Sequence, residues 1–432
     1  MKSLVLLALT ERVAQTLLDE GSYCDSLARS DLSGLNQQSV RKLDCSFHMA
    51  THIAEYVDPS IIRTAVPAVK FGRAPGKPRT VINFGMHCHL LVPDLFWPER
   101  EFRKIYDDLA TPALIQLLAK GRRRHAKTES VEAWLCEQFE VEKEADWPIA
   151  PYSLLADGGE PGGHHWLRAD PVHLRIEGGR MVLVDSNEFS LSQQEADSLC
   201  GSLNAHFSAD GLSLHPLRPQ RWYLRSEAAP ALETTPVAAA AAAGRSIDSL
   251  LPRGDDAATW RAHLNDMQML LHAHQVNAAR EDAGDLPING VWLWGAGTRA
   301  DEVSTPFDAV WSSDPFAQGL ALAARSAAHN LSEGAAGLLR ASAGEGVALI
   351  VLDSLRQPAC YGDAHAWRES LQQLERDWVA PLLEALRQER IGMLSLHALG
   401  PKGVLSTEAT RGDLRRFWRR VKPLTAYVKG LS

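Results

Sequence analysis

The stretch Val347-Ala348-Leu349-Ile350-Val351-Leu352 is continuously apolar and ends at Asp353. An unbroken apolar strand is typical of a sheet that is buried on both faces, as parallel sheets are. The next segment has apolar residues at helical spacing, at Trp367, Leu371, Leu374, Trp378, Leu382 and Leu386. We expect this helix to bend at Pro381 and a short strand to follow at residues 391–396. The order strand, helix, strand is the repeating unit of an α/β fold.

The same alternation continues towards the N-terminus. Further strands are predicted at residues 87–92 and 290–294, and further helices at residues 102–120, 130–139, 258–279 and 316–328. A capping box, Ser192-Gln193-Gln194-Glu195, predicts another helix to about residue 207. Paired strands are predicted within residues 166–189, with the turn at 177–180, and a bent strand at 212–225. The pattern favours a largely parallel central sheet covered by helices on both sides.

Two segments interrupt this organisation. Residues 17–46 show no sustained apolar period, and residues 65–77 are loop-like. Residues 1–85 are therefore either a loosely attached extension or a gene-start artefact, with translation beginning at Met86. Residues 226–245 contain Pro230, Pro236 and six consecutive alanines, which favours an exposed linker. We therefore expect an N-terminal extension followed by one α/β domain at residues 86–432.

Composition narrows the range of partners and compartments. The chain has 432 residues and a formal net charge of -8, so it has no whole-molecule attraction for phosphate backbones or anionic lipid. Its six cysteines form no Cys-x-x-Cys pair, which favours free thiols in a reducing cytoplasm. No apolar run approaches ~18 residues, so we expect no membrane span.

Two aspartates lie just beyond predicted strands. Asp94 follows the strand at 87–92, and Asp353 follows the strand at 347–352. Ligands of open α/β sheets bind outside the carboxyl ends of the strands, so both carboxylates are candidates for holding a ligand or a metal. Asp94 is better explained as a turn residue, whereas a turn or helix-cap role explains Asp353 equally well.

Other motifs offer weaker candidates. Gly295 and Gly297 follow a strand, and such a turn can present backbone N–H groups to an anion or can simply be a tight turn. Arg415, Arg416, Arg419 and Arg420 surround Phe417 and Trp418, a combination that binds phosphate or nucleic acid, although a solvated helix face is more common. Residues 122–124 are three further arginines, expected at a helix end, where cations suit the helix dipole.

Several blocks resemble the RpfE-type regulatory protein family. They are residues 89–93, 96–98, 106–109, 112–114, 121–122, 166–174, 216–219, 221–224 and 289–297. The most specific are Ala-Asp-Pro-Val-His-Leu at 169–174 and Trp-Leu-Trp-Gly at 292–295, and the match runs from about Met86 to the C-terminus. This family is similar to archaeal-type cofactor-independent phosphoglycerate mutases of the alkaline-phosphatase superfamily.

The resemblance implies an α/β/α sandwich and an ancestry in metal-dependent phosphoryl transfer. Active members hold two divalent metals through Asp and His ligands and use a serine nucleophile. Here Asp94 is displaced from the expected Asp-Gly position, and the expected histidine of the 353–363 segment is Cys360 or Tyr361. The last ligand strand keeps at most His397. Losing several anionic ligands should remove a two-metal site.

The sequence thus predicts a regulatory or ligand-sensing protein on a degenerate scaffold, with little or no catalysis and no cofactor. Its ligand candidates are Asp94, Asp353, Asp363, His397, Gly295 and Gly297. We expect a small anion or a protein as partner and no membrane. Nucleic acid, bound through the C-terminal arginines, is a disfavoured third hypothesis. The rival hypothesis is a working phosphoglycerate mutase or phosphatase that holds Mn²⁺ or Mg²⁺ through Asp94, Asp353 and His397, with Asp363 nearby. No catalytic residue is assigned in either case.

Overall fold

The computed structural model describes residues 85–98, 103–237, 240, 247–341 and 345–428. All of them belong to one compact unit, Ile82–Ser432. The predicted extension at residues 1–85 lies outside the described residues except for Gly85. Within the described part of the chain, no helix has the length and apolar character needed to cross a bilayer.

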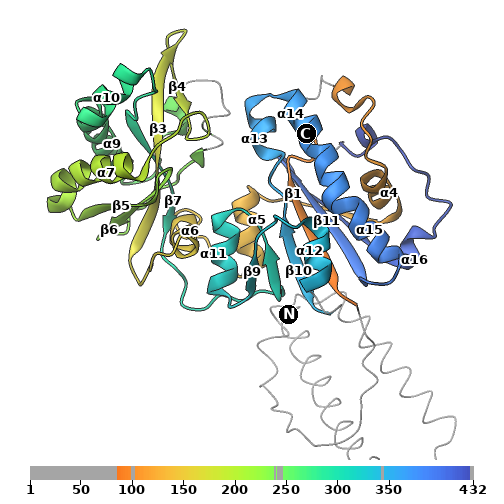
Figure 1. Cartoon of the computed structure of the whole chain (residues 1–432). Helices are drawn as coiled ribbons and strands as arrows, with labels where there is room; N and C mark the ends of the chain where they lie inside the picture. Colours follow the sequence, from red (N-terminus) through yellow and green to blue (C-terminus); the bar gives the residue numbers. More distant parts are fainter. Residues whose placement is uncertain (1–84, 99–102, 238–239, 241–246, 342–344, 429–432) are drawn as a thin grey trace, which may run out of the picture. The chain divides into compact units, whose positions relative to one another are not determined.

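A seven-stranded sheet forms the centre of the unit, in the order β2-β12-β11-β1-β10-β8-β9 (Figure 1). Its strands are β1 (His87–Pro93), β2 (Arg122–Ala126), β8 (Ala309–Trp311), β9 (Ala327–His329), β10 (Val347–Val351), β11 (Met393–Gly400) and β12 (Gly403–Ala409). The five strands from β11 to β9 are parallel to one another, whereas β12 is antiparallel to both of its neighbours. The predicted α/β fold with a largely parallel sheet is confirmed.

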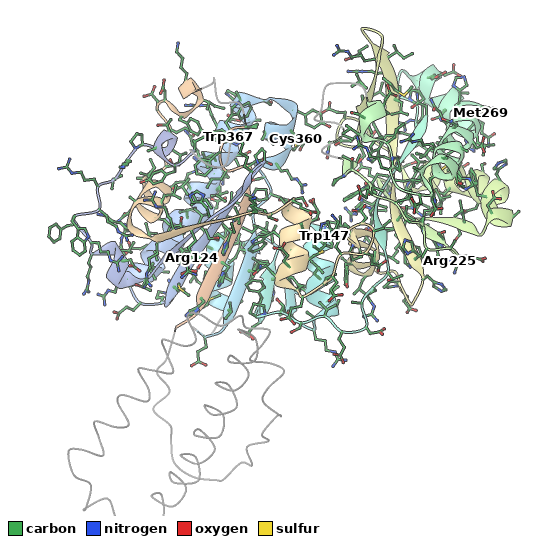
Figure 2. All side chains as sticks on the ribbon, turned by 180° about the vertical axis from the view of Figure 1, so that it is seen from behind. Arg124, Trp147, Arg225, Met269, Cys360 and Trp367 are labelled. Carbon is green, nitrogen blue, oxygen red and sulfur yellow. The ribbon has the colours of Figure 1, made fainter. Side chains whose placement is uncertain are left out.

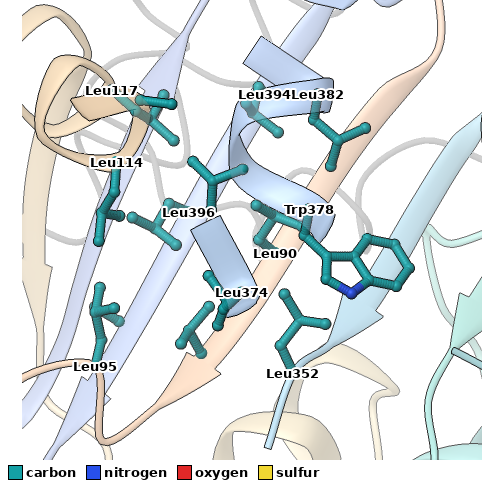
Figure 3. Packing of buried hydrophobic residues seen from close by; sticks show 14 of the residues in the cluster. Leu90, Leu95, Leu114, Leu117, Leu352, Leu374, Trp378, Leu382, Leu394 and Leu396 are labelled. Atoms are coloured by element: carbon teal, nitrogen blue, oxygen red, sulfur yellow. The ribbon is translucent and has the colours of Figure 1, made fainter. Parts of the chain in front are cut away.

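Helices cover both faces of this sheet, because alternate residues of each central strand point to opposite sides. On β1, Leu90 joins a core shared with the helices α4 (Pro112–Lys120), α14 (Ala364–Leu374) and α15 (Ala380–Arg387). Leu91 joins a second core shared with α5 (Val131–Gln138), α6 (Ile149–Ala156) and α11 (Pro315–Ala323). The result is the predicted three-layer α/β/α sandwich. Figure 3 shows the first core, with Leu90 beside Trp378.

The predicted helix at residues 102–120 is wrong at its N-terminal end. A short 3₁₀ turn, η2 (Arg103–Tyr106), is separated from α4 by a loop in which Asp108 has a φ of 57°. Pro112 occupies the first turn of α4, where its missing N–H costs nothing. The carboxylate of Glu375 accepts hydrogen bonds from the N–H groups of Ala113 and Leu114 at 2.6 and 3.0 Å, so a distant residue caps this helix.

The helix predicted after β10 is interrupted as expected, but by a π-helical turn rather than by Pro381. A π-helical turn, η5 (Glu375–Val379), joins α14 to α15, and Pro381 lies in the first turn of α15. Such a turn admits one extra residue into an α-helix. The apolar stripe therefore stays on the sheet on both sides of the interruption.

A second sheet is antiparallel and contains β3 (His165–Glu177), β4 (Arg180–Val184), β5 (Leu212–Arg218), β6 (Arg221–Ser226) and β7 (Gly290–Gly297). The predicted β3–β4 hairpin is confirmed, with Gly178 and Gly179 both at positive φ in its turn. The single bent strand predicted at 212–225 is instead the β5–β6 hairpin. A separate core packs this sheet against α7 (Gln193–Phe207), α9 (Ala257–His272) and α10 (Gln275–Ala283).

Two predicted helices need correction here. The helix predicted at 258–279 is divided into α9 and α10, because His274 caps α10 by accepting a hydrogen bond from the Val276 N–H at 3.1 Å. The helix predicted at 316–328 ends with α11 and is followed by β9. Shorter elements are η3 (Ser208–Asp210), η4 (Ile247–Leu250), α12 (Gly334–Ala341), α13 (Arg356–Tyr361), α16 (Arg411–Leu414) and η6 (Leu424–Ala426).

The described part of the predicted linker makes specific contacts. Glu233 forms an isolated bridge with Arg253, and Thr234 donates hydrogen bonds from its N–H and its hydroxyl to Asp146. Residues 238–239 and 241–246, including most of the alanine run, lie outside the described residues.

Candidate ligand site

Three aspartates follow three adjacent parallel strands. Asp94 follows β1, Asp353 follows β10 and Asp314 follows β8, and these strands lie side by side in the sheet. The carboxyl ends of parallel strands share one edge, so the topology gathers the three carboxylates. The backbone of Asp94, at a φ of 52°, donates from its N–H to the Leu399 carbonyl at 2.9 Å. The Asp94 carbonyl accepts from the Trp367 indole at 2.9 Å, which fixes this turn.

A guanidinium group lies among these carboxylates. Arg356, the first residue of α13, donates to a carboxylate oxygen of Glu132 on α5 at 2.6 Å. The Glu132 charge raises the pKa of Arg356 above its already high usual value, against the effect of burial, and Asp94 and Asp314 raise it further. Arg356 therefore keeps its positive charge at any physiological pH. The second carboxylate oxygen of Glu132 is buried and has no hydrogen-bond partner among the described residues.

The carboxylates differ in how readily they take up a proton. Burial raises the pKa of Asp94 to about 6, although Arg356 opposes the rise. Burial and the nearby Asp353 charge raise the pKa of Asp314 to about 6. Burial also raises the pKa of Asp353. Burial would raise the pKa of Glu132 too, but its ion pair with Arg356 outweighs that effect and holds the pKa below its usual value.

His397 belongs to a different group of contacts. Its Nε2 lies 3.1 Å from Nδ1 of His89, and its Nδ1 lies 2.9 Å from the hydroxyl of Ser406. The two rings are stacked, with centroids 5.4 Å apart and an interplanar angle of 2°. Burial lowers the pKa of His397 to about 3, helped by His89, and that of His89 to about 4, helped by His87. Both rings are neutral at pH 7 and are already engaged in hydrogen bonds.

The remaining sequence candidates have structural contacts of their own. Asp363 caps α14 by accepting a hydrogen bond from the Ala366 N–H at 2.9 Å. The N–H of Gly295 donates to the Thr234 hydroxyl at 2.9 Å. A Cβ on Gly295 would lie 2.8 Å from Ile149, and one on Gly297 would lie 2.5 Å from Pro148. Both glycines therefore permit close packing of β7 against the start of α6.

The structure thus places Asp94 and Asp353 after neighbouring strands and gives Asp363, His397, Gly295 and Gly297 other partners. Sequence reasoning missed Asp314, Glu132 and Arg356. Asp314 follows a strand of only three residues, which is too short for a periodic signal. Glu132 and Arg356 are 224 residues apart, so no local pattern relates them.

The side chains at this edge include a cation, Arg356, as well as carboxylates. Among the residues that the structure describes, no group of three or more His, Cys, Asp or Glu side chains is arranged to hold a metal ion. Arg356 supplies the positive charge that a bound cation would otherwise bring to the aspartates. Burial, with the neighbouring Asp94 charge, raises the pKa of Cys360 on α13 (Figure 2), so this side chain is a thiol and a poor ligand.

Comparison with known proteins gives sequence relatives of one kind, although no protein-family model matches the chain. The 2,3-bisphosphoglycerate-independent phosphoglycerate mutase of Methanosarcina mazei is 26% identical over 211 residues, which is 45% of this chain and 50% of the relative. The corresponding Methanosarcina barkeri protein is 28% identical over 137 residues, 31% of this chain and 34% of the relative. The chain spans about half the length of the first of these curated relatives and about a third of the second.

Two solved structures are also similar. A cofactor-independent phosphoglycerate mutase from Thermoplasma acidophilum has a TM-score of 0.43 at 15% identity, covering 79% of this chain and 94% of its own. A protein from Pyrococcus horikoshii has a TM-score of 0.49 at 12% identity, covering 76% and 88%. The sequence relatives support a phosphoglycerate-mutase-like scaffold, so that part of the predicted resemblance is confirmed. Membership of the RpfE-type regulatory family stays a prediction.

Proposed function

We propose that this protein is a regulatory, ligand-sensing member of the RpfE type, built on a phosphoglycerate-mutase-like scaffold and without metal-dependent phosphoryl transfer. The observation that carries the proposal is the Arg356–Glu132 ion pair at 2.6 Å among the strand-end aspartates. A fixed guanidinium permanently offsets part of the carboxylate charge and occupies Glu132, whereas a metal centre needs its carboxylates free to bind. Several ligand positions implied by the resemblance are replaced as well.

The chemistry of this edge also bears on its ligand. Four carboxylates, Glu132, Asp94, Asp314 and Asp353, influence one guanidinium, so anionic groups outnumber the cation when all are ionised. Such an edge accepts hydrogen bonds and repels anions. We therefore propose a ligand that presents hydroxyl or ammonium donors here, in preference to the small anion expected from the sequence.

The decisive experiment combines metal content with a change at Arg356. Purified full-length protein should contain no stoichiometric Mn²⁺ or Mg²⁺ and should show no phosphoglycerate mutase or phosphomonoesterase turnover above background. Arg356→Ala would leave the aspartates and Glu132 without a cation. We expect added Mn²⁺ to raise the Tm of this variant by at least ~2 °C and to leave the wild-type Tm unchanged.

The matched control is Arg340→Ala. It removes an exposed arginine of α12 that pairs with Glu333. Its response to Mn²⁺ should equal that of the wild type. Stoichiometric metal in the wild type, with turnover that Asp353→Asn abolishes, would establish the alternative instead. That alternative, a metal-dependent phosphoglycerate mutase or phosphatase, is favoured by the names of the sequence relatives.

We also propose that the protein works in the cytoplasm. The four described cysteines, Cys88, Cys136, Cys200 and Cys360, form no disulfide, and burial raises the thiol pKa of each. Thiols of this kind suit a reducing compartment. Fractionation of cells that express the full chain would test the proposal, and recovery outside the cytoplasm would contradict it.

A further inference from the structure

An edge strand of the central sheet is strongly basic. The segment Arg122-Arg123-Arg124 was expected at the end of a helix, but it opens β2, the outermost strand beside β12. All five residues of β2 are exposed (Arg124 is labelled in Figure 2). Three consecutive guanidinium groups on an extended edge face solvent in a chain whose net charge is -8.

A second basic segment lies against this region. Residues 415–422 are held on the end of α4, where Lys120 donates from Nζ to the carbonyls of Arg416 and Arg419 at 2.8 and 2.6 Å. Arg419 donates in return to the carbonyls of Lys120 and Gly121 at 2.7 and 2.5 Å. These reciprocal hydrogen bonds fix the segment beside β2. We call β2 together with residues 415–422 the arginine surface.

The arginine surface contains a cavity of about 400 Å³ with a cationic lining. Four cationic side chains line it, namely Arg123, Arg419, Arg420 and Lys422, together with Ala119, Gly121 and Tyr427. The Arg123 guanidinium is oriented by the Tyr427 ring, whose centroid is 5.2 Å away. None of the described residues that line the cavity is acidic, so its positive charge is complementary to an anion.

Few of these cations are neutralised. Asp413, which is buried, pairs with Arg416 at 2.8 Å and approaches Arg122 at 3.9 Å. Within the described ranges, no carboxylate forms an ion pair with Arg123, Arg420 or Lys422. Gathering uncompensated cations raises the free energy of the folded chain, and a bound polyanion would offset that cost.

Large aromatic side chains project next to the cavity. Phe417 is 85% exposed and Trp418 is 65% exposed, which is unusual for side chains of this size in a folded unit. Their rings meet edge to face, with centroids 5.2 Å apart at 84°. An exposed indole beside guanidinium groups is suited to stacking a planar base while the cations hold phosphate.

We propose that the arginine surface binds single-stranded nucleic acid, with backbone phosphate in the four-cation cavity and a base stacked on Trp418. Arginine dominates the cations, and its planar fork binds phosphate bidentately and stacks on bases, which lysine does not. Only Phe417, Trp418 and Val421 are large apolar groups exposed here, too few for a strong membrane anchor. This proposal is independent of the one made for the strand-end site.

The test is fluorescence anisotropy of the full chain with a labelled single-stranded RNA of about 16 nucleotides, over a series of salt concentrations. Two to four phosphate contacts predict a slope of log K against log salt of about -1.4 to -2.8. Arg123→Ala with Arg420→Ala should flatten that slope by ~1.4 and weaken binding at low salt at least ~10-fold. Trp418→Ala should weaken binding by about 10-fold, mainly in the part that salt does not affect.

The matched control removes the same charge elsewhere. Arg175→Ala with Arg180→Ala changes two exposed arginines at the tip of the β3–β4 hairpin and should leave both affinity and slope unchanged. Equal weakening in this control would show that net charge alone drives binding and would overturn the proposal. So would binding to phosphatidylserine vesicles with none to RNA, or a wild-type affinity in Trp418→Ala. Circular dichroism of each variant verifies that it is folded.

Discussion

At the scale of single residues, the contact between Glu132 and Arg356 determines the character of the strand-end site. The Glu132 side chain is nearly inaccessible to solvent, at 7% exposure, whereas the Arg356 side chain is 28% exposed. Burying an ion pair brings little net stability, but removing one partner leaves the other charge buried and uncompensated. Substituting either residue alone should therefore destabilise the fold more than substituting both.

A double-mutant cycle makes this a quantitative prediction. Arg356→Met should lower the free energy of unfolding by ~2 kcal/mol, less than the ~3–5 kcal/mol of fully buried pairs because Arg356 is partly exposed. Adding Glu132→Gln should restore most of that loss, since the buried carboxylate is gone. Urea unfolding of the two single variants and the double variant measures the coupling. Strictly additive effects would show that the two side chains do not depend on each other.

Strand-end reasoning found Asp94 and Asp353 because a single rule links a strand to the residue after it. Arg356 lies only three residues beyond Asp353, yet its role depends on α5, which is distant in sequence. A contact of that kind leaves no local pattern. The same holds for His397, whose partners His89 and Ser406 are on neighbouring strands.

At the scale of elements, the close contact between α6 and α11 depends on one glycine. Gly319 on α11 lies against α6, and a Cβ at this position would lie 1.8 Å from the Tyr152 carbonyl oxygen. No side-chain rotation relieves a clash with backbone. The two helices must separate, or the substitution is not accommodated.

Gly319→Ala should therefore lower the free energy of unfolding by ~3 kcal/mol or more. Gly201→Ala is the matched control, because Gly201 is inside α7 with nothing within 4 Å of its would-be Cβ. There the same substitution should stabilise the protein by ~0.5–1 kcal/mol through helix propensity. Denaturant unfolding of both variants separates the two effects, and a neutral Gly319→Ala would refute the close approach.

Elements with a strong periodic signal were predictable and short or interrupted ones were not. The apolar strands β1 and β10 and the capping box of α7 follow from local sequence alone. β2 and β12 were missed, and β2 contains arginines rather than apolar residues because it is an exposed edge. Its strand conformation comes from pairing with β12, which is a tertiary effect.

At the scale of the whole molecule, buried titrating groups act in opposite directions on stability. His89 and His397 have pKa values lowered to about 4 and 3, so the unfolded chain binds more protons than the folded one as pH falls below ~6.5. These histidines therefore destabilise the fold on acidification. Asp94 and Asp314 have pKa values raised to about 6, so they contribute stability at low pH that is lost as pH rises through ~6.

Two substitutions should separate these contributions. His397→Asn removes one of the histidines that destabilise the fold on acidification. The Tm of this variant should therefore fall less than that of the wild type between pH 7 and pH 4.5. Asp314 caps α11 by accepting hydrogen bonds from the N–H groups of Phe316 and Ala317. Asp314→Asn keeps a capping oxygen but removes the titrating carboxylate, so its Tm should fall more over the same range. Calorimetry across this range tests both signs, and parallel curves for all three proteins would contradict the assignment.

The overall layering was predictable because it follows from alternation of strands and helices, and the phosphoglycerate-mutase likeness follows from short blocks of sequence. The arginine surface was not, because it is assembled from β2 and residues 415–422, which are almost 300 residues apart. The sequence made nucleic acid an unfavoured partner on the basis of net charge. Net charge averages over a surface that folding divides into regions of opposite sign.

The two edges of the central sheet invite one last comparison. An unpaired strand edge is a template on which another chain can add a strand, and natural sheets guard against this with short or charged outer strands. One edge strand, β9, is only three residues long. The other, β2, begins with three adjacent arginines, whose charge disfavours the addition of another strand. Arg123, which lines the cavity proposed to hold phosphate, thus also discourages the sheet from growing into neighbouring molecules. Selection against aggregation and selection for an anion partner would both act on this arginine.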